Sequence, residues 1–268
     1  MQRIKTLFLV TFGLLIFRGW NIFPNRLLAA DMAKDSTHES GLNASTIINL
    51  NELTANPENY DFFTFRPNLE KLILSGAADT EHISILWYTV PDGSVGLHYH
   101  SMTESVYSID GSQTDAKGVY PTGSLYFNPP SSGHSISDST GFFILAYASP
   151  PDFANTDLIR DYTPIQINTL DPELESMYPF EEAQDDVLVY DIPLDSDGGM
   201  RSQFIKSASL ENYDYQGNYL LVLKGLCTID GTVFDKDMLV VAQTIQTQSY
   251  QVSAPEGHSC LALGLSFQ

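Results

Sequence analysis

Two histidines and a glutamate stand at a spacing that suits a metal site. His98 and His100 are two residues apart, and Glu104 follows four residues later. Alternate residues of a β-strand point to the same face, so these three side chains can enter one cavity from an extended segment. Two imidazoles and a carboxylate form a plausible ligand set for a divalent metal ion. A fourth ligand has to come from another strand.

His134 is the candidate for this fourth ligand. It follows Gly133 at the end of a proline-containing turn, which would place a histidine on a new strand. A His-x-His pair alone is more often a surface or coincidental feature, and a lone glutamate is usually solvated. The combination, with glycines at both expected turns, favours the metal interpretation. We therefore predict a metal site formed by His98, His100, Glu104 and His134, and the sequence assigns no catalytic residue.

The predicted ligands limit the chemistry of the site. Neutral imidazoles and one carboxylate leave one bound divalent metal ion with a net charge of about +1, and an octahedral ion keeps positions open for water, dioxygen or substrate. An anionic or chelating small molecule would be attracted there. The ligands do not distinguish Fe, Mn, Zn or Ni. Nearby tyrosines are candidate proton donors, although barrel packing is their more common role: Tyr88, Tyr99, Tyr107 and Tyr126.

The elements that must hold these residues are predicted to be strands. Short apolar runs such as residues 82–90 and 141–147 alternate with breaks rich in Gly, Pro, Asp and Asn, which is typical of an all-β barrel or sandwich. Extended helical periodicity is missing. The clearest helix is short, with Asp171 as its cap and Pro172 at its first position.

A second block of predicted strands, residues 187–268, repeats the spacing of the first. Residues 104–111 match residues 218–225, and residues 123–127 match residues 237–241, which indicates an internal duplication. In this overlay the ligand positions of the second block hold Asn212, Asp214, Asn218 and Tyr250. The second block is therefore expected to lack the metal site and to be structural, with a separate ligand pocket as the alternative.

The two histidine segments resemble the motifs of the cupin superfamily. Gly93 followed by His98, His100, Glu104 and Gly111 is similar to the first cupin motif. The segment from Gly123 through Pro129 to His134 is similar to the second, although Gly133 directly precedes the histidine. The resemblance implies two tandem cupin barrels (double-stranded β-helix, jelly-roll). It extends to bacterial two-cupin (bicupin) proteins and, more distantly, to the cupin module of ChrR-type anti-sigma factors.

The first residues resemble an export signal. Arg3 and Lys5 precede an apolar run over residues 6–17, and small residues end at Ala30. An uncleaved membrane anchor is the alternative. We predict a signal peptide over residues 1–30, a flexible linker over 31–46, a metal-binding cupin domain over 47–158, a connector with a short helix over 159–186 and a degenerate cupin domain over 187–268. The expected location is periplasmic or extracellular, without stable membrane insertion after cleavage.

The acidic composition argues against nucleic acid as a partner. The chain has 268 residues, 13 basic and 33 acidic side chains, and a net charge of -20. A surface this acidic repels nucleic acid. The two cysteines, Cys227 and Cys260, are expected to be either bridged or buried as free thiols. The histidines His38, His82 and His258 have no partners at ligand spacing and are expected at the surface or at caps.

The implied function is that of a metal-dependent cupin acting on a small-molecule ligand. Cupins that the chain resembles include dioxygenases and lyases, so an oxygenase-like or lyase-like enzyme is the first expectation, and fold alone does not choose between them. A non-catalytic small-ligand-binding or sensing module with a metal anchor is the alternative. The second barrel could also form the surface of a homodimer.

Overall fold

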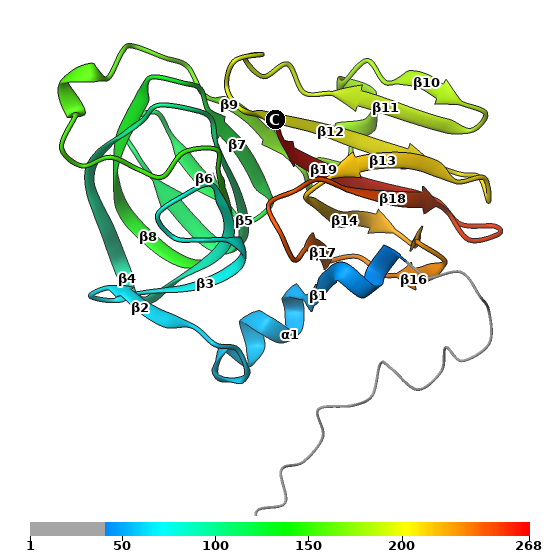
Figure 1. The fold of residues 1–268 in the computed structure, drawn as a ribbon, viewed down its shortest axis with the longest axis horizontal. Coiled ribbons are helices and arrows are strands. Elements are labelled where there is room, and N and C mark those ends of the chain that lie inside the picture. Colours follow the sequence, from blue (N-terminus) through cyan, green and yellow to red (C-terminus); the bar gives the residue numbers. More distant parts are fainter. Residues whose placement is uncertain (1–40) are drawn as a thin grey trace, which may run out of the picture. The chain divides into compact units, whose positions relative to one another are not determined.

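The computed structural model describes residues 41–268, so the predicted signal peptide and most of the predicted linker lie outside the described residues. Strands dominate this part of the chain, as the sequence predicts, and they form two consecutive barrels (Figure 1). Among the described residues, no helix is long and apolar enough to cross a membrane.

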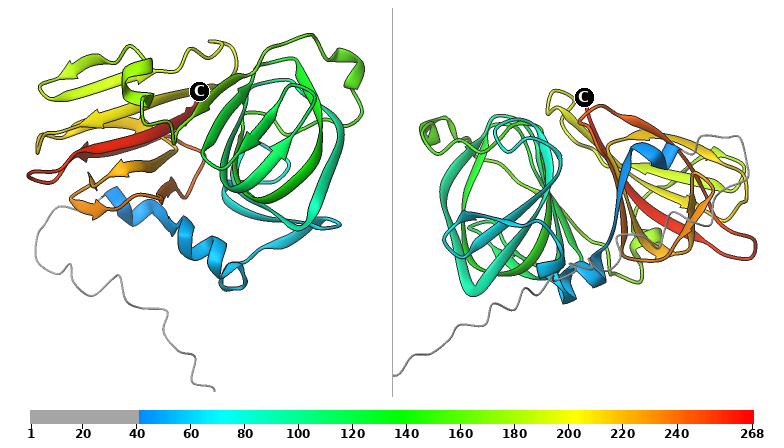
Figure 2. Two further views of the ribbon diagram at one scale, coloured as in Figure 1. Left: turned by 180° about the vertical axis from the view of Figure 1, so that it is seen from behind. Right: turned by 60° about the horizontal axis from the view of Figure 1, so that its bottom comes forward.

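One curled sheet forms the first barrel. Figures 1 and 2 show this barrel from three directions. Its strand order is β2-β3-β4-β8-β5-β7-β9, and β6 pairs with β5. The strands are β2 (Phe63–Arg66), β3 (Leu69–Gly76), β4 (His82–His100), β5 (Glu104–Thr114), β6 (Val119–Pro121), β7 (Ser124–Asn128), β8 (Ser132–Tyr147) and β9 (Ile165–Asn168).

Two sheets form the second barrel. The larger has the order β1-β17-β14-β19-β12-β11-β10, and the smaller has the order β13-β18-β15-β16. Their strands are β1 (Ser45–Asn49), β10 (Glu181–Gln184), β11 (Val187–Asp191), β12 (Met200–Ser207), β13 (Tyr213–Gly217), β14 (Tyr219–Gly225), β15 (Cys227–Ile229), β16 (Thr232–Phe234), β17 (Met238–Ala242), β18 (Gln248–Ser253) and β19 (Cys260–Phe267).

The helices are short. The α-helices are α1 (Leu50–Ala55) and α2 (Leu174–Met177), and the 3-10 helices are η1 (Gly41–Ala44), η2 (Pro57–Asn59) and η3 (Thr156–Leu158). The predicted helix after Asp171 begins later than expected, with Glu173 as its N-cap residue. Helix α1 was not predicted. The side chain of Asn49 caps it by accepting hydrogen bonds from the backbone N–H groups of Asn51 and Glu52.

Strand pairing differs from the predicted domain bounds at three segments. β1, expected at the junction of the linker and the first barrel, pairs with β17 of the second barrel (Figure 1). Two strands lie within the predicted connector: β9 pairs with β7, and β10 pairs with β11. Short strands can satisfy their backbone groups on any free sheet edge, so sequence order did not reveal their partners.

Three hydrophobic cores organise the described residues. One fills the first barrel and includes Tyr88, Phe143 and Tyr147. Another fills the second barrel and includes Tyr215 and Tyr250. The largest combines the outward faces of both barrels, for example Ile85 of β4 and Phe204 of β12. A shared apolar core stabilises both barrels because its area is removed from water only when both are folded.

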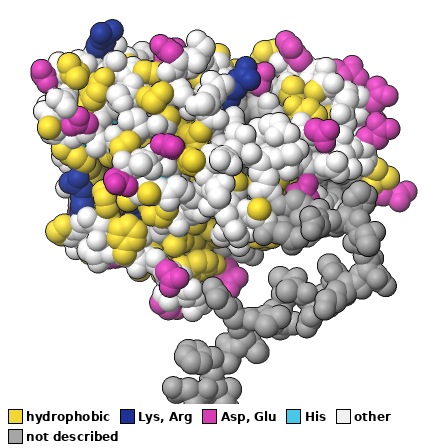
Figure 3. All heavy atoms as spheres, in the orientation of Figure 1, with side chains coloured by type: hydrophobic (Ala, Val, Ile, Leu, Met, Phe, Trp, Pro, Cys, Tyr) yellow, Lys and Arg dark blue, Asp and Glu magenta, His cyan; other side chains and the backbone are white. Residues whose placement is uncertain are grey.

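The surface agrees with the acidic composition. Acidic side chains are scattered over the visible face (Figure 3). They show no single binding patch, which fits a role in solubility.

Candidate metal centre

The structure brings the four predicted ligands together inside the first barrel. His98 and His100 lie at the end of β4, Glu104 begins β5, and His134 lies near the start of β8. The antiparallel register pairs His98 directly with His134. One possible ligand atom from each residue lies within 4.8 Å of all the others. All four residues are buried, with exposures between 0% and 4%.

The alternation of β4 explains the placement of its two histidines. Tyr99 lies between them with its side chain on the other face, and its backbone pairs with Asp152. His98 and His100 therefore point into the barrel together, as the His-x-His spacing predicts.

The carboxylate of Glu104 joins the imidazoles. Its Oε2 atom lies 3.4 Å from Nε2 of His100 and 3.3 Å from Nε2 of His134. Oε2 also accepts a hydrogen bond of 2.7 Å from the side-chain amide of Asn128. Burial raises the pKa of Glu104, but the neighbouring histidines more than offset this effect and hold it well below its usual range. Glu104 is therefore ionised.

Hydrogen bonds at the other ring nitrogens orient two of the histidines. Nδ1 of His98 donates to the carbonyl oxygen of Gly96 at 2.9 Å. Nδ1 of His134 donates to Oδ2 of Asp115, also at 2.9 Å. Both rings then direct Nε2 toward the cluster, which is the arrangement typical of metal-ligating histidines.

His100 gives the clearest sign that a metal fits. Its ring is 0% exposed, yet neither nitrogen has a hydrogen-bond partner among the described residues. A buried polar atom without a hydrogen bond is costly, and a coordinated cation would remove that cost at Nε2 beside Glu104. This donor set of three imidazoles and one carboxylate suits Fe, Mn, Zn or Ni.

Burial and neighbouring charges lower the pKa values of two of the histidines and raise that of the third. Burial lowers the pKa of His98 to about 4 and that of His100 to about 3. Burial also acts to lower the pKa of His134, but Glu104 and Asp115 more than offset it and raise the value to about 9. In the metal-free protein at neutral pH, His134 thus holds a proton beside Glu104 while the other two rings are neutral.

The sequence did not reveal the supporting residues. Asp115 accepts hydrogen bonds from His134, from the hydroxyl of Tyr120 and from the backbone N–H groups of Lys117 and Gly118. Only the turn-like spacing from Asp115 to Gly118 could have indicated this role. Asn128 carried no signal, because its contact with Glu104 depends on the pairing of β5 with β7.

Phe153 and Arg66 lie beside His98. The ring of Phe153 is 5.2 Å from that of His98, and the Arg66 guanidinium lies 4.1 Å from the centroid of Phe153. Phe153 is exposed, whereas His98 is buried. The segment after β8 therefore covers one side of the candidate metal centre.

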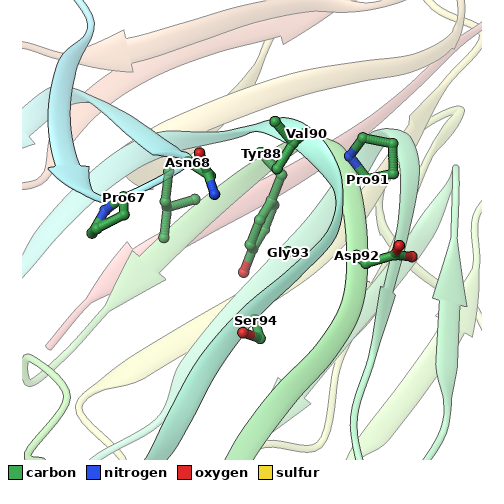
Figure 4. A pocket seen from close by; sticks show the side chains of 9 residues that line it. Pro67, Asn68, Tyr88, Val90, Pro91, Asp92, Gly93 and Ser94 are labelled. Atoms are coloured by element: carbon green, nitrogen blue, oxygen red, sulfur yellow. The ribbon is translucent and has the colours of Figure 1, made fainter.

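A small pocket opens at the turn between β2 and β3. It has a volume of about 150 Å³, and its lining includes Asn68, Asp92 and Ser94. Tyr88, a residue of the barrel core, also lines it (Figure 4). A Cβ atom at Gly93 would clash with the Tyr88 ring, so the glycine of the first motif makes room for this tyrosine.

The second barrel has no equivalent cluster among the described residues. The register pairs Tyr250 with Tyr215, as it pairs His134 with His98. Tyr215, and not Asn212, therefore occupies the position corresponding to His98. Asn212 and Asp214 are exposed, so the sequence overlay was wrong at these positions. The reason is that the connection between β13 and β14 is shorter than the connection between β4 and β5.

The expectation for His82 was also wrong. It is not a surface histidine but is 0% exposed, and its Nε2 lies 2.7 Å from the ammonium group of Lys71. His258 is exposed as predicted, and His38 lies outside the described residues.

Comparisons with known proteins agree with this fold. Residues 50–150 match the family described as the ChrR Cupin-like domain. No curated protein sequence matches the chain significantly.

Solved structures share the two-barrel arrangement at low identity. A putative dioxygenase from Nostoc punctiforme is 11% identical, with a TM-score of 0.50 over 83% of this chain and 82% of its own. A Cupin 2 conserved barrel domain protein from Leptotrichia buccalis is 12% identical, with a TM-score of 0.51 over 83% and 96%. A variant of salicylate 1,2-dioxygenase from Pseudoaminobacter salicylatoxidans, in complex with gentisate, is 13% identical, with a TM-score of 0.51 over 82% and 81%. Residues 50–150 therefore form a domain of the cupin kind, and the described part of the chain has the fold of these cupin structures.

Proposed function

We propose that the first barrel binds one divalent metal ion through His98, His100, Glu104 and His134, and that the protein acts there on a small organic molecule. The observation that carries this proposal is the buried, unpaired imidazole of His100 beside the carboxylate of Glu104. The second barrel holds buried tyrosines where the first holds histidines, so we expect one metal ion per chain.

We further propose that the substrate is anionic or chelating and that the reaction is oxygenase-like or lyase-like. A bound metal ion supplies Lewis acidity and, if it is iron, a means of activating dioxygen. The residues of this chain keep the site buried, hold the Glu104 carboxylate ionised and orient the Nε2 atoms of His98 and His134. Two of the solved structures described above are named as dioxygenases, so dioxygen uptake is the first activity to test.

The metal assignment is tested by metal analysis of the wild-type protein and three variants. We expect one equivalent in the wild type, strong loss in His100→Ala and His134→Ala, and no change in Asp214→Ala, whose carboxylate is exposed in the second barrel. Two equivalents in the wild type, or full metal content in His100→Ala, would contradict the single site. If metal-loaded protein shows no turnover with dioxygen and candidate organic acids, the non-catalytic binding or sensing alternative is favoured.

Export is part of the same proposal. The apolar run after Arg3 and Lys5 supports it, and so does the disulfide between Cys227 and Cys260, because disulfides persist mainly in oxidising compartments. Mass spectrometry of the protein from the producing cells should find Asp31 as the first residue. A chain that still carries residues 1–17 would contradict cleavage.

A further inference from the structure

The first barrel contains a buried cation that the metal site does not use. Lys71 of β3 is 2% exposed and faces the barrel interior with the core residues Leu69 and Leu86. Among the described residues it forms no ion pair with a carboxylate. Burying a charge without a counter-charge is costly, so such a group is a candidate for function.

His82 positions the ammonium group. Nδ1 of His82 lies 2.7 Å from the carbonyl oxygen of Thr80, which can only accept, so Nδ1 donates and Nε2 is left as an acceptor. Lys71 Nζ donates to that Nε2 at 2.7 Å. The aromatic faces of Phe65 and Tyr147 lie 4.7 Å and 5.3 Å from Nζ. The ammonium has three donors, so two remain for a ligand.

Ser84 adds a second observation. Its hydroxyl is fully buried and has no hydrogen-bond partner among the described residues. Ser84 pairs with Leu145 of the interior core, and in the register it lies diagonal to Lys71, on the same side of the sheet as His82. An ammonium and an unpaired hydroxyl that face the same interior are suited to an anion with several acceptor oxygens.

The register also fixes the relation to the metal centre. Tyr147 pairs with His82 on one side and with Glu104 on the other. His82 is thus separated from Glu104 by two strand spacings, about 10 Å between backbones, and the backbone of Lys71 lies one strand further away, on β3. The ring of Tyr147 lies 5.0 Å from that of His82 and 5.9 Å from that of His100, so it contacts both groups.

We propose that Lys71, positioned by His82 and assisted by Ser84, binds the carboxylate of a small organic ligand whose other end binds the metal. This inference rests on the proposed metal site and narrows its substrate to a molecule with a carboxylate several ångströms from its metal-binding group. Charge supports it, because the charges of a divalent ion, Glu104, Asp115 and Lys71 sum to about +1, and a buried positive charge attracts an anion.

The test compares glutarate with valerate, two five-carbon acids of which only glutarate has a second carboxylate. The full-length protein loaded with Co(II) should bind glutarate about tenfold more tightly than valerate, as one charge-assisted hydrogen bond would produce. Lys71→Met should abolish this preference. Lys236→Met, which removes the same charge from an exposed position in the second barrel, should retain it.

Repeating the measurement on metal-free protein shows whether the ligand must also bind the metal ion. A Lys71-dependent preference that needs Co(II) indicates a ligand bound at both points, while one that survives without metal indicates a carboxylate site that also takes free anions. Both outcomes support binding by Lys71. Equal affinities in the Co(II)-loaded wild type, or an unchanged preference in Lys71→Met, would overturn it.

A measurement on the wild type alone covers the case in which Lys71→Met does not fold. Burial lowers the pKa of Lys71 to about 8, against the opposing charge of Glu104. The titratable groups that face it are His82, Tyr147 and Glu104. The preference for glutarate should therefore shrink as pH rises from 7 to 9.5, and a constant preference would contradict the role of Lys71. Failure to bind Co(II) would instead refute the proposed metal site.

Discussion

The two ring nitrogens of His134 face different carboxylates. Nδ1 contacts Asp115, and Nε2 faces Glu104, where the metal would be coordinated. In the metal-free protein the Nε2 proton occupies the place of the metal ion, because two carboxylates raise the pKa of this histidine to about 9. Metal binding and proton release are therefore linked at this residue.

This linkage predicts the pH dependence of metal affinity. His98 and His100 are neutral above about pH 4 and 3, so at higher pH only His134 must lose a proton. Affinity should rise about tenfold per pH unit between pH 5.5 and about 9 and then level off, with one proton released per metal. Chelator competition across this range measures it. A plateau near pH 6.5, the ordinary histidine value, would contradict the assigned charge state.

Asp115 provides a second prediction at the residue scale. Asp115→Asn removes the negative charge that orients His134, so metal affinity should fall by about 10- to 100-fold. The pKa of His134 should also fall, which moves the plateau of the affinity profile to lower pH. Asp110→Asn, which changes an exposed carboxylate of β5 five residues before Asp115, is the control. An unchanged plateau in Asp115→Asn would show that Asp115 does not set the charge state of His134.

At the scale of elements, bent strands shape the first barrel. Gly111 of β5 has φ +84 and pairs with Gly141 of β8, which has φ +94. Glycine adopts such positive φ values without the steric cost that a side chain brings. A Cβ atom at Gly111 would also clash with the backbone carbonyl of Thr140. The glycine that ends the first motif therefore serves the close approach of two strands.

Gly111→Ala should accordingly destabilise the protein by about 2 kcal/mol or more, because both the backbone conformation and the contact become unfavourable. Gly96→Ala is a matched control, since a Cβ atom there would meet nothing within 4 Å. Its effect should stay within about 0.5 kcal/mol. Urea denaturation of the two variants measures the free energies of unfolding. Equal stabilities would show that β5 and β8 can separate at little cost.

At the scale of the whole molecule, the two barrels differ in what they contain. The first holds the histidine cluster, and the second holds the disulfide between Cys227 of β15 and Cys260 of β19, which joins its two sheets. Both cysteines are buried in the core of the second barrel. The expectation that this disulfide has no role in metal binding can be tested directly.

Cys227→Ser together with Cys260→Ser should lower the free energy of unfolding by about 3–4 kcal/mol, because the bridge closes a loop with a sequence separation of 33. Metal content at a temperature where the variant remains folded should not change. Thermal unfolding and metal analysis of the same samples provide both readings. Metal loss in the folded variant would show that the second barrel holds the site in shape.

The sequence by itself determined the local features of this protein. Alternation along the strand predicted that His98 and His100 share a face, and the turn before His134 predicted the fourth member of the cluster; all four side chains do converge. The expectation that Glu104 continues the same extended segment was wrong, because β4 ends at His100 and Glu104 begins β5. Frequent breaks between apolar runs predicted strands, and residues 141–147 indeed lie within β8. These features depend on the period of a strand and on turn chemistry, which act over a few residues.

Only the tertiary structure decided which distant segments meet. Asp115 and Asn128 contact His134 and Glu104 through contacts between segments that no local sequence pattern encodes. Strand β1 precedes the first barrel in the sequence but pairs with β17 of the second barrel. His82 looked like a surface residue, yet it lies in the barrel interior with Lys71. Backbone hydrogen bonds between strands are nearly independent of sequence, so register and partner are set by how all the buried faces pack together.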